Sequence, residues 1–261
     1  MNPLQDVRLY LLDMDGTFYL DDHLLPGALE FLSRVRRSGR RFMFLTNNSS
    51  KNRRDYLDKL AGLGAQVGED ELFTSADATL EYLDECAFPR EMLLIGTPSL
   101  EEQFRARGYR IDAEEPKGVV LGFDTTITYE KLTKLCNAVR AGLPYIATHP
   151  DYNCPVQGGF IPDIGAVIAF VQASTGRLPD LVVGKPNAMI ARAAARRAGL
   201  SVEQLCMVGD RLYTDIALGQ NCPIKTALVL CGETTPADAA RSSIRPTVTA
   251  DSLAGLLRYL D

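Results

Sequence analysis

Residues 9–17 read L-Y-L-L-D-M-D-G-T, and this short stretch decides the fold. Its first four residues are apolar and are followed at once by Asp13, a pattern typical of a buried strand with a polar side chain at its carboxyl end. Asp15 and Gly16 come directly afterwards. In open parallel sheets, ligands bind beyond the carboxyl ends of the strands. The stretch therefore predicts one strand of a parallel sheet, with polar groups gathered at its end.

Strand-like and helix-like patterns alternate along the rest of the chain. Residues 26–38 are predicted to be helical, because Leu29, Leu32 and Val35 share one face and Gly39 follows them. This βαβα rhythm predicts an α/β fold with a Rossmann-like, doubly wound parallel sheet that carries helices on both faces. Further strands are predicted at 42–45, 92–95, 118–123, 145–148, 181–183, 205–208 and 227–230, and further helices at 50–64, 99–108 (with a Ser99–Glu102 capping box), 128–141, 163–174, 187–198, 214–220 and 252–259.

Composition and charge narrow the class of protein. The 261 residues are enough for one large domain or two modest ones, and 46% apolar with 23% charged residues is ordinary for a soluble globular protein. A formal net charge of -5 argues against a nucleic-acid polymer as a partner. The longest apolar run is far shorter than the ~20 residues of a membrane span, so no membrane partner is expected. The six cysteines form no C-x-x-C pair and no signal peptide is evident, which predicts reduced thiols in a cytoplasmic protein.

Polar residues follow four of the predicted strands. A single polar residue after a strand is common and often only caps the next helix. Four such sets together supply carboxylates, a hydroxyl, amides and an ammonium, and this combination favours a shared site at one edge of the sheet. The four sets are Asp13-Met14-Asp15-Gly16-Thr17, Thr46-Asn47-Asn48, Gly184-Lys185-Pro186, and Gly209-Asp210 with Asp215.

The chemistry that these residue types favour is phosphoryl transfer. A phosphate ester is anionic, so a carboxylate attacks its phosphorus only if negative charge is neutralised. Mg²⁺ is a hard ion that prefers oxygen ligands, and Asp13, Asp15 and Asp210 are candidates to hold it. Lys185 is a candidate to neutralise phosphate oxygens, and Thr46–Asn47 to donate hydrogen bonds to them.

Taken in order, the four sets resemble the four motifs of the haloacid dehalogenase (HAD) superfamily: D-x-D-G-T at 13–17, T-N at 46–47, the lysine of G-K-P at 184–186, and G-D-x-x-x-T-D at 209–215. Two further segments, T-H-P-D at 148–151 and G-F-I-P-D-I-G-A at 159–166, are similar to subfamily IIA, the NagD-like and p-nitrophenylphosphatase-like phosphatases. The resemblance implies an HAD-like catalytic core of residues 1–82 and 182–261, with a large α/β cap for substrate specificity inserted at 83–181.

The resemblance also implies a role for each matching residue. Asp13 would be the nucleophile and a magnesium ligand. Asp15 would be the general acid and base, and would bind magnesium through its backbone carbonyl. Asp210 would complete the protein ligands of the metal. Thr46, Asn47, Lys185, Arg211, Leu212, Tyr213 and Thr214 would surround the phosphate, while Gly16 and Asp215 would support the site.

The implied function is Mg²⁺-dependent hydrolysis of small phosphomonoesters through an aspartyl-phosphate. The partner would be a small phosphorylated metabolite, such as a nucleotide or a sugar phosphate, with p-nitrophenyl phosphate as a generic substrate. Two alternatives stay open: a phosphotransferase or phosphomutase that uses the same intermediate, and a non-catalytic binding protein. Loss of Asp13, Asp15 or Asp210 would mark the latter, and all three are present.

The expected cap contains a segment that would touch the leaving group. Residues 153–159, which include Gln157, are predicted to form a flexible loop, and Asp163–Ala166 begin the following helix. A helix N-terminus favours polar or anionic groups, but Asp163 would counter a second negative charge, so a small polar leaving group such as ribose is expected. His149 fits a turn before Pro150 and a substrate contact equally well. A homodimer formed through the cap is a further expectation.

Overall fold

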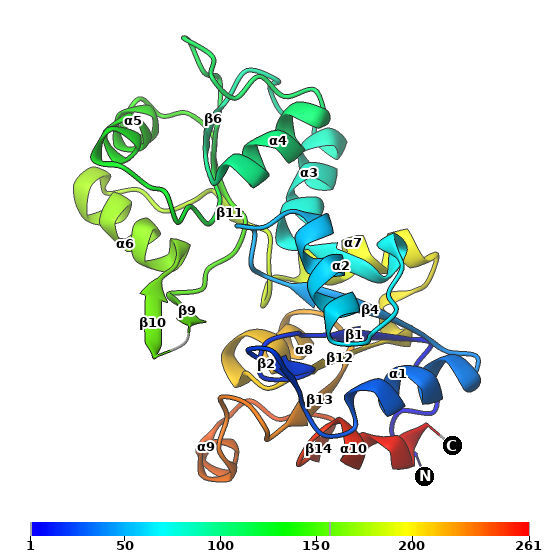
Figure 1. Ribbon diagram of the computed structural model, residues 1–261. Coiled ribbons are helices and arrows are strands. Elements are labelled where there is room, and N and C mark those ends of the chain that lie inside the picture. Colours follow the sequence, from blue (N-terminus) through cyan, green and yellow to red (C-terminus); the bar gives the residue numbers. More distant parts are fainter. Residues whose placement is uncertain (1, 157, 261) are drawn as a thin grey trace. The chain divides into compact units, whose positions relative to one another are not determined.

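The computed structural model describes residues 2–156 and 158–260, which divide into two compact units (Figure 1). Unit 1 consists of Met1–Thr46, Tyr56–Phe73 and Lys185–Asp261, and unit 2 of Asn47–Asp55 and Thr74–Gly184. The domain boundary expected after residue 82 falls inside helix α3 (Ser75–Glu85), all of which belongs to unit 2. The chain returns to unit 1 at Lys185, close to the expected return at residue 182.

Unit 1 is built on a six-stranded sheet in the order β14-β13-β12-β1-β4-β5. β1 pairs in parallel with both β4 and β12, so that Leu12 lies opposite Phe44 on one side and Val208 on the other. Parallel neighbours end at the same edge of a sheet, which brings the residues that follow β1, β4 and β12 together. The strands are β1 (Leu9–Leu12), β4 (Arg41–Thr46), β5 (Leu72–Thr74), β12 (Leu205–Gly209), β13 (Lys225–Val229) and β14 (Val248–Ala250).

Both faces of this sheet are buried. Tyr10 and Leu12 of β1 belong to the same apolar cluster as Phe31 of α1, whereas Leu9 and Leu11 point to the opposite face and are buried as well. A parallel sheet needs cover on both faces, and the helices provide it. They are α1 (Ala28–Arg37), α2 (Arg53–Gly62, shared with unit 2), α7 (Ala188–Ala198), α8 (Leu218–Asn221), α9 (Pro236–Arg241), α10 (Leu253–Leu256), the short η1 (Glu69–Glu71), η2 (Val202–Gln204) and η4 (Leu257–Tyr259), and the π-helical η3 (Leu212–Ile216).

Unit 2 has its own parallel sheet, in the order β11-β8-β7-β6 (Figure 1). Its apolar core joins strand residues such as Leu121 and Tyr145 to Leu135 of α5 and Val171 of α6. No helix within the described ranges has both the length and the apolar composition to cross a bilayer. The elements are β6 (Leu93–Ile95), β7 (Val119–Leu121), β8 (Tyr145–Ala147), β11 (Leu181–Val182), the antiparallel hairpin β9 (Asn153–Val156) and β10 (Gly159–Pro162), and helices α3, α4 (Pro98–Ala106), α5 (Tyr129–Arg140) and α6 (Ile164–Thr175).

The predicted α/β class is confirmed, and three local predictions are wrong. α4 begins after Thr97, whose hydroxyl accepts a hydrogen bond from Leu100 N, so Ser99 and Glu102 do not form its capping box. The expected loop at 153–159 contains strand β9 and the start of β10, because residues 153–156 pair in antiparallel fashion with residues 159–162. The expected helix at 214–220 is split between η3 and α8. The hydrophobic pattern of the sequence also missed β5 and α3. The strand β5 is too short to give a clear period.

Candidate active site

Residues from three of the polar sets meet at one edge of the sheet in unit 1. Asp13 follows β1, and its backbone N donates to Val208 O of β12 at 2.9 Å. Asp210 follows β12, and Thr46 is the last residue of β4 on the other side of β1. All three side chains are buried. The parallel register thus concentrates two carboxylates and a hydroxyl at the edge where ligands bind in such sheets.

Lys185 brings a buried positive charge into this cluster. Its Nζ donates to Asp13 Oδ1 at 2.6 Å, to Asp215 Oδ1 at 2.7 Å and to Leu45 O at 3.1 Å. Burial by itself would lower the pKa of Lys185, but Asp13 and Asp215 more than offset it and raise that pKa above its ordinary value. The ammonium is therefore held in its charged form, paired on two sides as a buried charge must be.

The carboxylates crowd one another. Asp13, Asp210 and Asp215 each offer an oxygen, and these three oxygens lie within 4.8 Å of one another. Burial, followed by the charge of Asp13, raises the pKa of Asp210 to about 6. Burial likewise raises the pKa of Asp215 to about 7, although Lys185 opposes the rise. Ionising all three groups is thus costly unless more positive charge is present.

The donor set fits a hard divalent cation. Asp13 Oδ2 is buried and has no hydrogen-bond partner among residues 2–156 and 158–260. A buried acceptor without a partner is costly, and a cation bound by oxygen ligands would satisfy it. Asp13 and Asp210 could hold Mg²⁺ in this way, whereas the charge of Asp215 is already paired with the Lys185 ammonium at 2.7 Å.

Asp210 is held in one orientation by its neighbours, of which Gly16 and Thr17 belong to the first motif, while Glu233 and Gly232 were not selected from the sequence. Thr17 Oγ1 donates to its Oδ1 at 3.2 Å, and Glu233 N donates to its Oδ2 at 2.7 Å. A Cβ on Gly16 or Gly232 would lie 2.4 or 2.1 Å from Asp210 Oδ2, so the carboxylate fits only against glycine. Gly232 comes soon after β13, and this position at a strand end was the signal by which it could have been found.

Asp15 also has a partner that was missed. Tyr19 lies in the small hairpin of β2 (Tyr19–Leu20) and β3 (His23–Leu24), and its hydroxyl hydrogen-bonds with the Asp15 side chain. Burial, and then the charge of Asp15, raise the pKa of Tyr19 above its ordinary value. The phenol therefore stays protonated and donates to Asp15, which helps to orient the carboxylate expected to be the general acid.

Arg211 is the N-cap of η3, and residues 212–214 form its start, directly after Asp210. Arg211 Nε donates to Glu233 Oε2 at 2.8 Å, Thr214 is buried, and Tyr213 is 54% exposed. These positions put the backbone of Arg211, Leu212, Tyr213 and Thr214 beside the carboxylate cluster. Their contact with phosphate stays a prediction.

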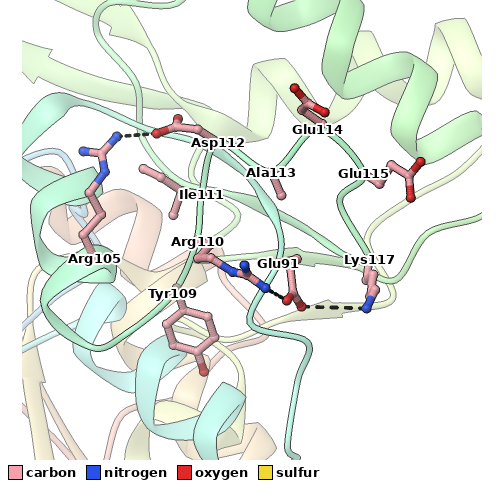
Figure 2. A pocket seen from close by; sticks show the side chains of 10 residues that line it. All are labelled: Glu91, Arg105, Tyr109, Arg110, Ile111, Asp112, Ala113, Glu114, Glu115 and Lys117. Atoms are coloured by element: carbon pink, nitrogen blue, oxygen red, sulfur yellow. Dashed lines mark hydrogen bonds and ion pairs between the residues drawn. The ribbon is translucent and has the colours of Figure 1, made fainter.

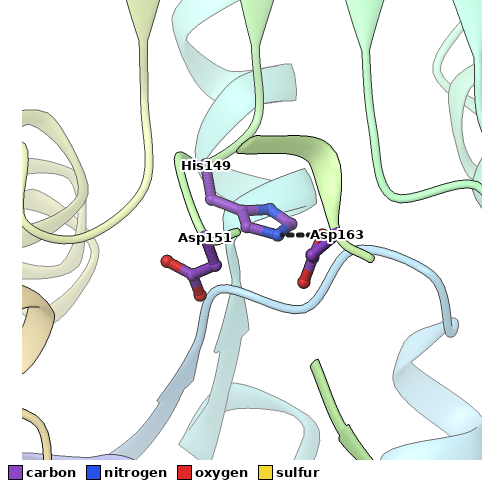
Figure 3. Close-up of side chains that lie close together, drawn as sticks. All are labelled: His149, Asp151 and Asp163. Carbon is purple, nitrogen blue, oxygen red and sulfur yellow. Dashed lines mark hydrogen bonds and ion pairs between the residues drawn. The ribbon is translucent and has the colours of Figure 1, made fainter. Parts of the chain in front are cut away.

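The remaining candidates belong to unit 2. Asn47 is buried there, and its Nδ2 donates to Asp151 Oδ1 at 3.0 Å. His149 is fully buried and hydrogen-bonds with Asp163, which caps α6 (Figure 3). Gln157 lies outside the described residues. The expected contact of the 153–166 segment with a leaving group stays a prediction.

Unit 2 also carries a surface hollow of about 760 Å³ (Figure 2). Five of its charged residues pair with one another: Arg105 with Asp112 at 3.0 Å, and Glu91 with both Arg110 and Lys117. Such mutual pairing is typical of a solvated surface. The carboxylate cluster of unit 1 is therefore the candidate active site.

Comparison with known proteins agrees with this geometry. Residues 10–110 match the haloacid dehalogenase-like hydrolase family, and residues 182–256 match a second, HAD-hydrolase-like family description. The acid sugar phosphatase of Staphylococcus saprophyticus is 34% identical over 99% of this chain and 100% of its own length. The chain belongs to the haloacid dehalogenase-like hydrolases. The superfamily resemblance read from the four motifs is thereby confirmed.

Solved structures of HAD-like hydrolases match over both units. The 4-nitrophenylphosphatase of Thermotoga maritima is 47% identical, with a TM-score of 0.97 and full coverage of both chains. The glycerol phosphate phosphatase of Mycobacterium tuberculosis, solved in complex with magnesium, is 29% identical with a TM-score of 0.89, over 98% of this chain and 79% of that one. NagD proteins match as well, so the predicted NagD-like and p-nitrophenylphosphatase-like branch is also confirmed. This HAD-like hydrolase thus lies among phosphatases of small phosphate compounds.

Proposed function

We propose that this protein is a Mg²⁺-dependent phosphatase that hydrolyses small phosphomonoesters with Asp13 as its nucleophile. The observation that carries the proposal is the state of the Asp13 carboxylate: Lys185 binds Oδ1, while Oδ2 is buried and has no hydrogen-bond partner within the described part of the chain. Relatives named acid sugar phosphatase, 5'-nucleotidase and dihydroxyacetone phosphatase support a small, soluble ester as substrate.

The proposed reaction has two steps. A carboxylate oxygen of Asp13 attacks phosphorus, the bond from phosphorus to the leaving oxygen breaks, and Asp15 gives its proton to that oxygen. Asp15 then takes a proton from water, whose oxygen attacks phosphorus, and the Asp13 carboxylate leaves with its electron pair. Lys185 keeps Asp13 oriented and offsets the negative charge that gathers around phosphorus.

Mg²⁺ is the proposed cofactor. Asp13, Asp210 and the backbone carbonyl of Asp15 would hold it, and Asp215 would act through its bond to Lys185 rather than as a ligand. When bound, the ion neutralises the clustered carboxylates and the phosphate oxygens. Thr46 and Asn47 would donate hydrogen bonds to the transferring group, with the backbone of residues 211–214 beside it.

Unit 2 is the proposed cap, which would choose the leaving group and mediate a homodimer. Its hairpin and α6 expose Tyr152, Phe160 and Phe170, which are 65%, 71% and 45% accessible. Exposed aromatic residues are common at protein interfaces. Light scattering of Phe160→Ser against the unchanged protein tests the dimer, and a monomeric unchanged protein would contradict it.

A phosphate-release assay tests the proposed function. The protein is incubated with Mg²⁺ and a panel of nucleotides, sugar phosphates, triose phosphates and p-nitrophenyl phosphate. Equal yields of phosphate and alcohol identify hydrolysis. Transfer of phosphate to an added sugar at the expense of free phosphate would identify a phosphotransferase. If no ester is turned over, the alternative of a non-catalytic binding protein is favoured.

A further inference from the structure

The carboxamide of Asn47 is clamped inside unit 2. Its Nδ2 donates to both carboxylate oxygens of Asp151, at 3.0 and 3.3 Å. Its Oδ1 lies so close to Gly184 that a Cβ there would be 2.7 Å away. The backbone carbonyl of Asn47 accepts a hydrogen bond from Ser75 Oγ at the first residue of α3. Both the main chain and the side chain of Asn47 are therefore fixed.

Asp151 is itself held by a rigid turn, 148–151. Its backbone carbonyl accepts from Gly165 N at 2.8 Å, in the first turn of α6. Within the turn, His149 Nε2 lies 3.0 Å from Asp163 Oδ1 (Figure 3), and the same oxygen accepts from Ile164 N at 2.6 Å. The turn is thus tied to the N-terminus of α6 through the main chain and through the buried histidine.

A second hydrogen bond joins the turn to the Asn47 segment. Ser49 Oγ lies 3.0 Å from Thr148 Oγ1, which lies 3.0 Å from His149 Nδ1, and Phe123 N donates to Ser49 Oγ at 2.9 Å. Asp163, His149, Thr148 and Ser49 thus form one continuous chain of hydrogen bonds. Every hydrogen bond in this chain has a donor and an acceptor, and a buried network that is satisfied in this way is rigid.

We infer that Asp151 is a positioning residue that orients Asn47 for phosphoryl transfer. The inference rests on the proposed function, in which the Thr46–Asn47 segment holds the transferring group. Segments 47–49 and 148–151 are joined twice, by Asn47–Asp151 and by Ser49–Thr148. The first of these bonds is made by the Asn47 side chain itself, so the carboxylate of Asp151 fixes the rotation of the Asn47 carboxamide.

A double-mutant cycle tests the inference. Asp151→Ala should lower kcat/KM about tenfold, as expected when a hydrogen bond to a charged group is lost, with most of the loss in kcat because the segment acts on the transition state. Asp151→Ala combined with Asn47→Ala should be about as slow as Asn47→Ala alone. Asp151→Asn keeps an acceptor oxygen and should recover most of the rate. Asp180→Ala is the control, since Asp180 accepts from Tyr145 N at 2.8 Å in the same unit and should change kcat/KM less than about twofold.

The side-chain amide of Asn47 gives a second readout that needs no turnover. Its ¹⁵N–¹H signals, assigned by their loss in Asn47→Ala, should move and broaden in Asp151→Ala and stay in place in Asp180→Ala. Unmoved signals in Asp151→Ala, or kinetic effects that simply multiply in the double variant, would overturn the inference. If the unchanged protein hydrolyses no ester, the proposed function fails and the catalytic role of Asp151 fails with it, whereas additive effects in an active enzyme would refute the positioning role alone.

Discussion

The ammonium nitrogen of Lys185 lies 2.6 Å from Asp13 Oδ1, and both side chains are buried. The contact joins residues 172 positions apart in the sequence and occupies one oxygen of the carboxylate. The other oxygen, Oδ2, has no hydrogen-bond partner in the described part of the chain. Lys185 thereby orients the proposed nucleophile as well as neutralising charge.

Replacing Lys185 with methionine should destabilise the protein strongly. The change leaves the buried carboxylates of Asp13 and Asp215 without their cation, and removal of one partner of a buried ion pair costs about 3–5 kcal/mol. The loss should be larger at pH 8 than at pH 5, because Asp215, whose pKa is raised to about 7, is neutral at the lower pH. Urea unfolding in EDTA at both pH values measures it. Lys134→Met, which removes an exposed pair with Glu130, is the control and should leave stability unchanged.

Asp13→Asn should stop phosphate release while keeping the fold. The amide has the same shape as the carboxylate but is a poor nucleophile and a weaker metal ligand, so the rate should fall at least about a thousandfold. Phosphate release measures the rate, and circular dichroism checks the fold. Asp112→Asn, on an exposed carboxylate of unit 2, controls for the substitution. A rate for Asp13→Asn within tenfold of the unchanged protein would rule out Asp13 as the nucleophile.

Asp15→Asn should separate the two steps of the reaction. Without a proton donor, only esters with very good leaving groups should phosphorylate Asp13, and the phosphorylated enzyme should then hydrolyse slowly because no base activates water. p-Nitrophenyl phosphate should give a burst of p-nitrophenol of about one equivalent, measured by stopped flow. The role given to Asp15 would be contradicted if Asp15→Asn turned over alkyl phosphates at ordinary rates and gave no larger burst of p-nitrophenol than the unchanged protein.

The sequence was sufficient for four strands of the main sheet in unit 1, β1, β4, β12 and β13, and for the charged residues that cluster at its edge. L-Y-L-L-D at 9–13 became β1 with the predicted bounds, and the residues after β1 and β12 meet because parallel strands end at the same edge. Such arguments work because strand burial and strand-end chemistry are local. They also explain why Asp13, Lys185 and Asp210 could be selected in advance.

The supporting residues could not be predicted in the same way. Tyr19 reaches Asp15 only through the β2–β3 hairpin, and Gly232 matters only because its missing side chain leaves room for Asp210. The bond from Asn47 to Asp151 spans 104 positions and depends on the fold of unit 2. No local pattern encodes a contact of this kind. The 153–159 segment was mistaken for a loop because Pro and Gly are also turn residues, and its pairing is visible only in space.

Metal-free protein should lose stability as the pH rises from about 4 to 7. Asp210 and Asp215 have pKa values raised from the ordinary 3.8 to about 6 and about 7, so in this window the folded protein binds more protons than the unfolded chain. Stability then falls with rising pH. Mg²⁺ binds the folded, ionised cluster and should restore stability most at the upper end of the window. Denaturant unfolding across this range, in EDTA and in Mg²⁺, measures both effects.

Asp210→Asn is the variant that decides whether the cluster causes this slope. It removes one of the two titrating carboxylates and one proposed metal ligand. Its unfolding free energy in EDTA should fall less steeply with pH, and Mg²⁺ should raise it less. The same slope in Asp210→Asn as in the unchanged protein, or stability that climbs between pH 5 and 7 in EDTA, would show that other groups control the pH dependence.

The last prediction concerns Gly232, which no motif selected. A Cβ at this position would lie 2.1 Å from Asp210 Oδ2 and 2.5 Å from Gly16 O, so Gly232→Ala must push the carboxylate away from its bonds to Thr17 and Glu233. We expect Mg²⁺ affinity, measured by calorimetry, to fall at least about tenfold. The hydrogen bonds that a metal-binding carboxylate accepts from its neighbours set its orientation toward the metal. Gly62→Ala is the matched control, since a Cβ there meets nothing within 4 Å. If Gly232→Ala has the same Mg²⁺ affinity and the same rate of phosphate release as Gly62→Ala, metal binding does not depend on the fixed orientation of Asp210.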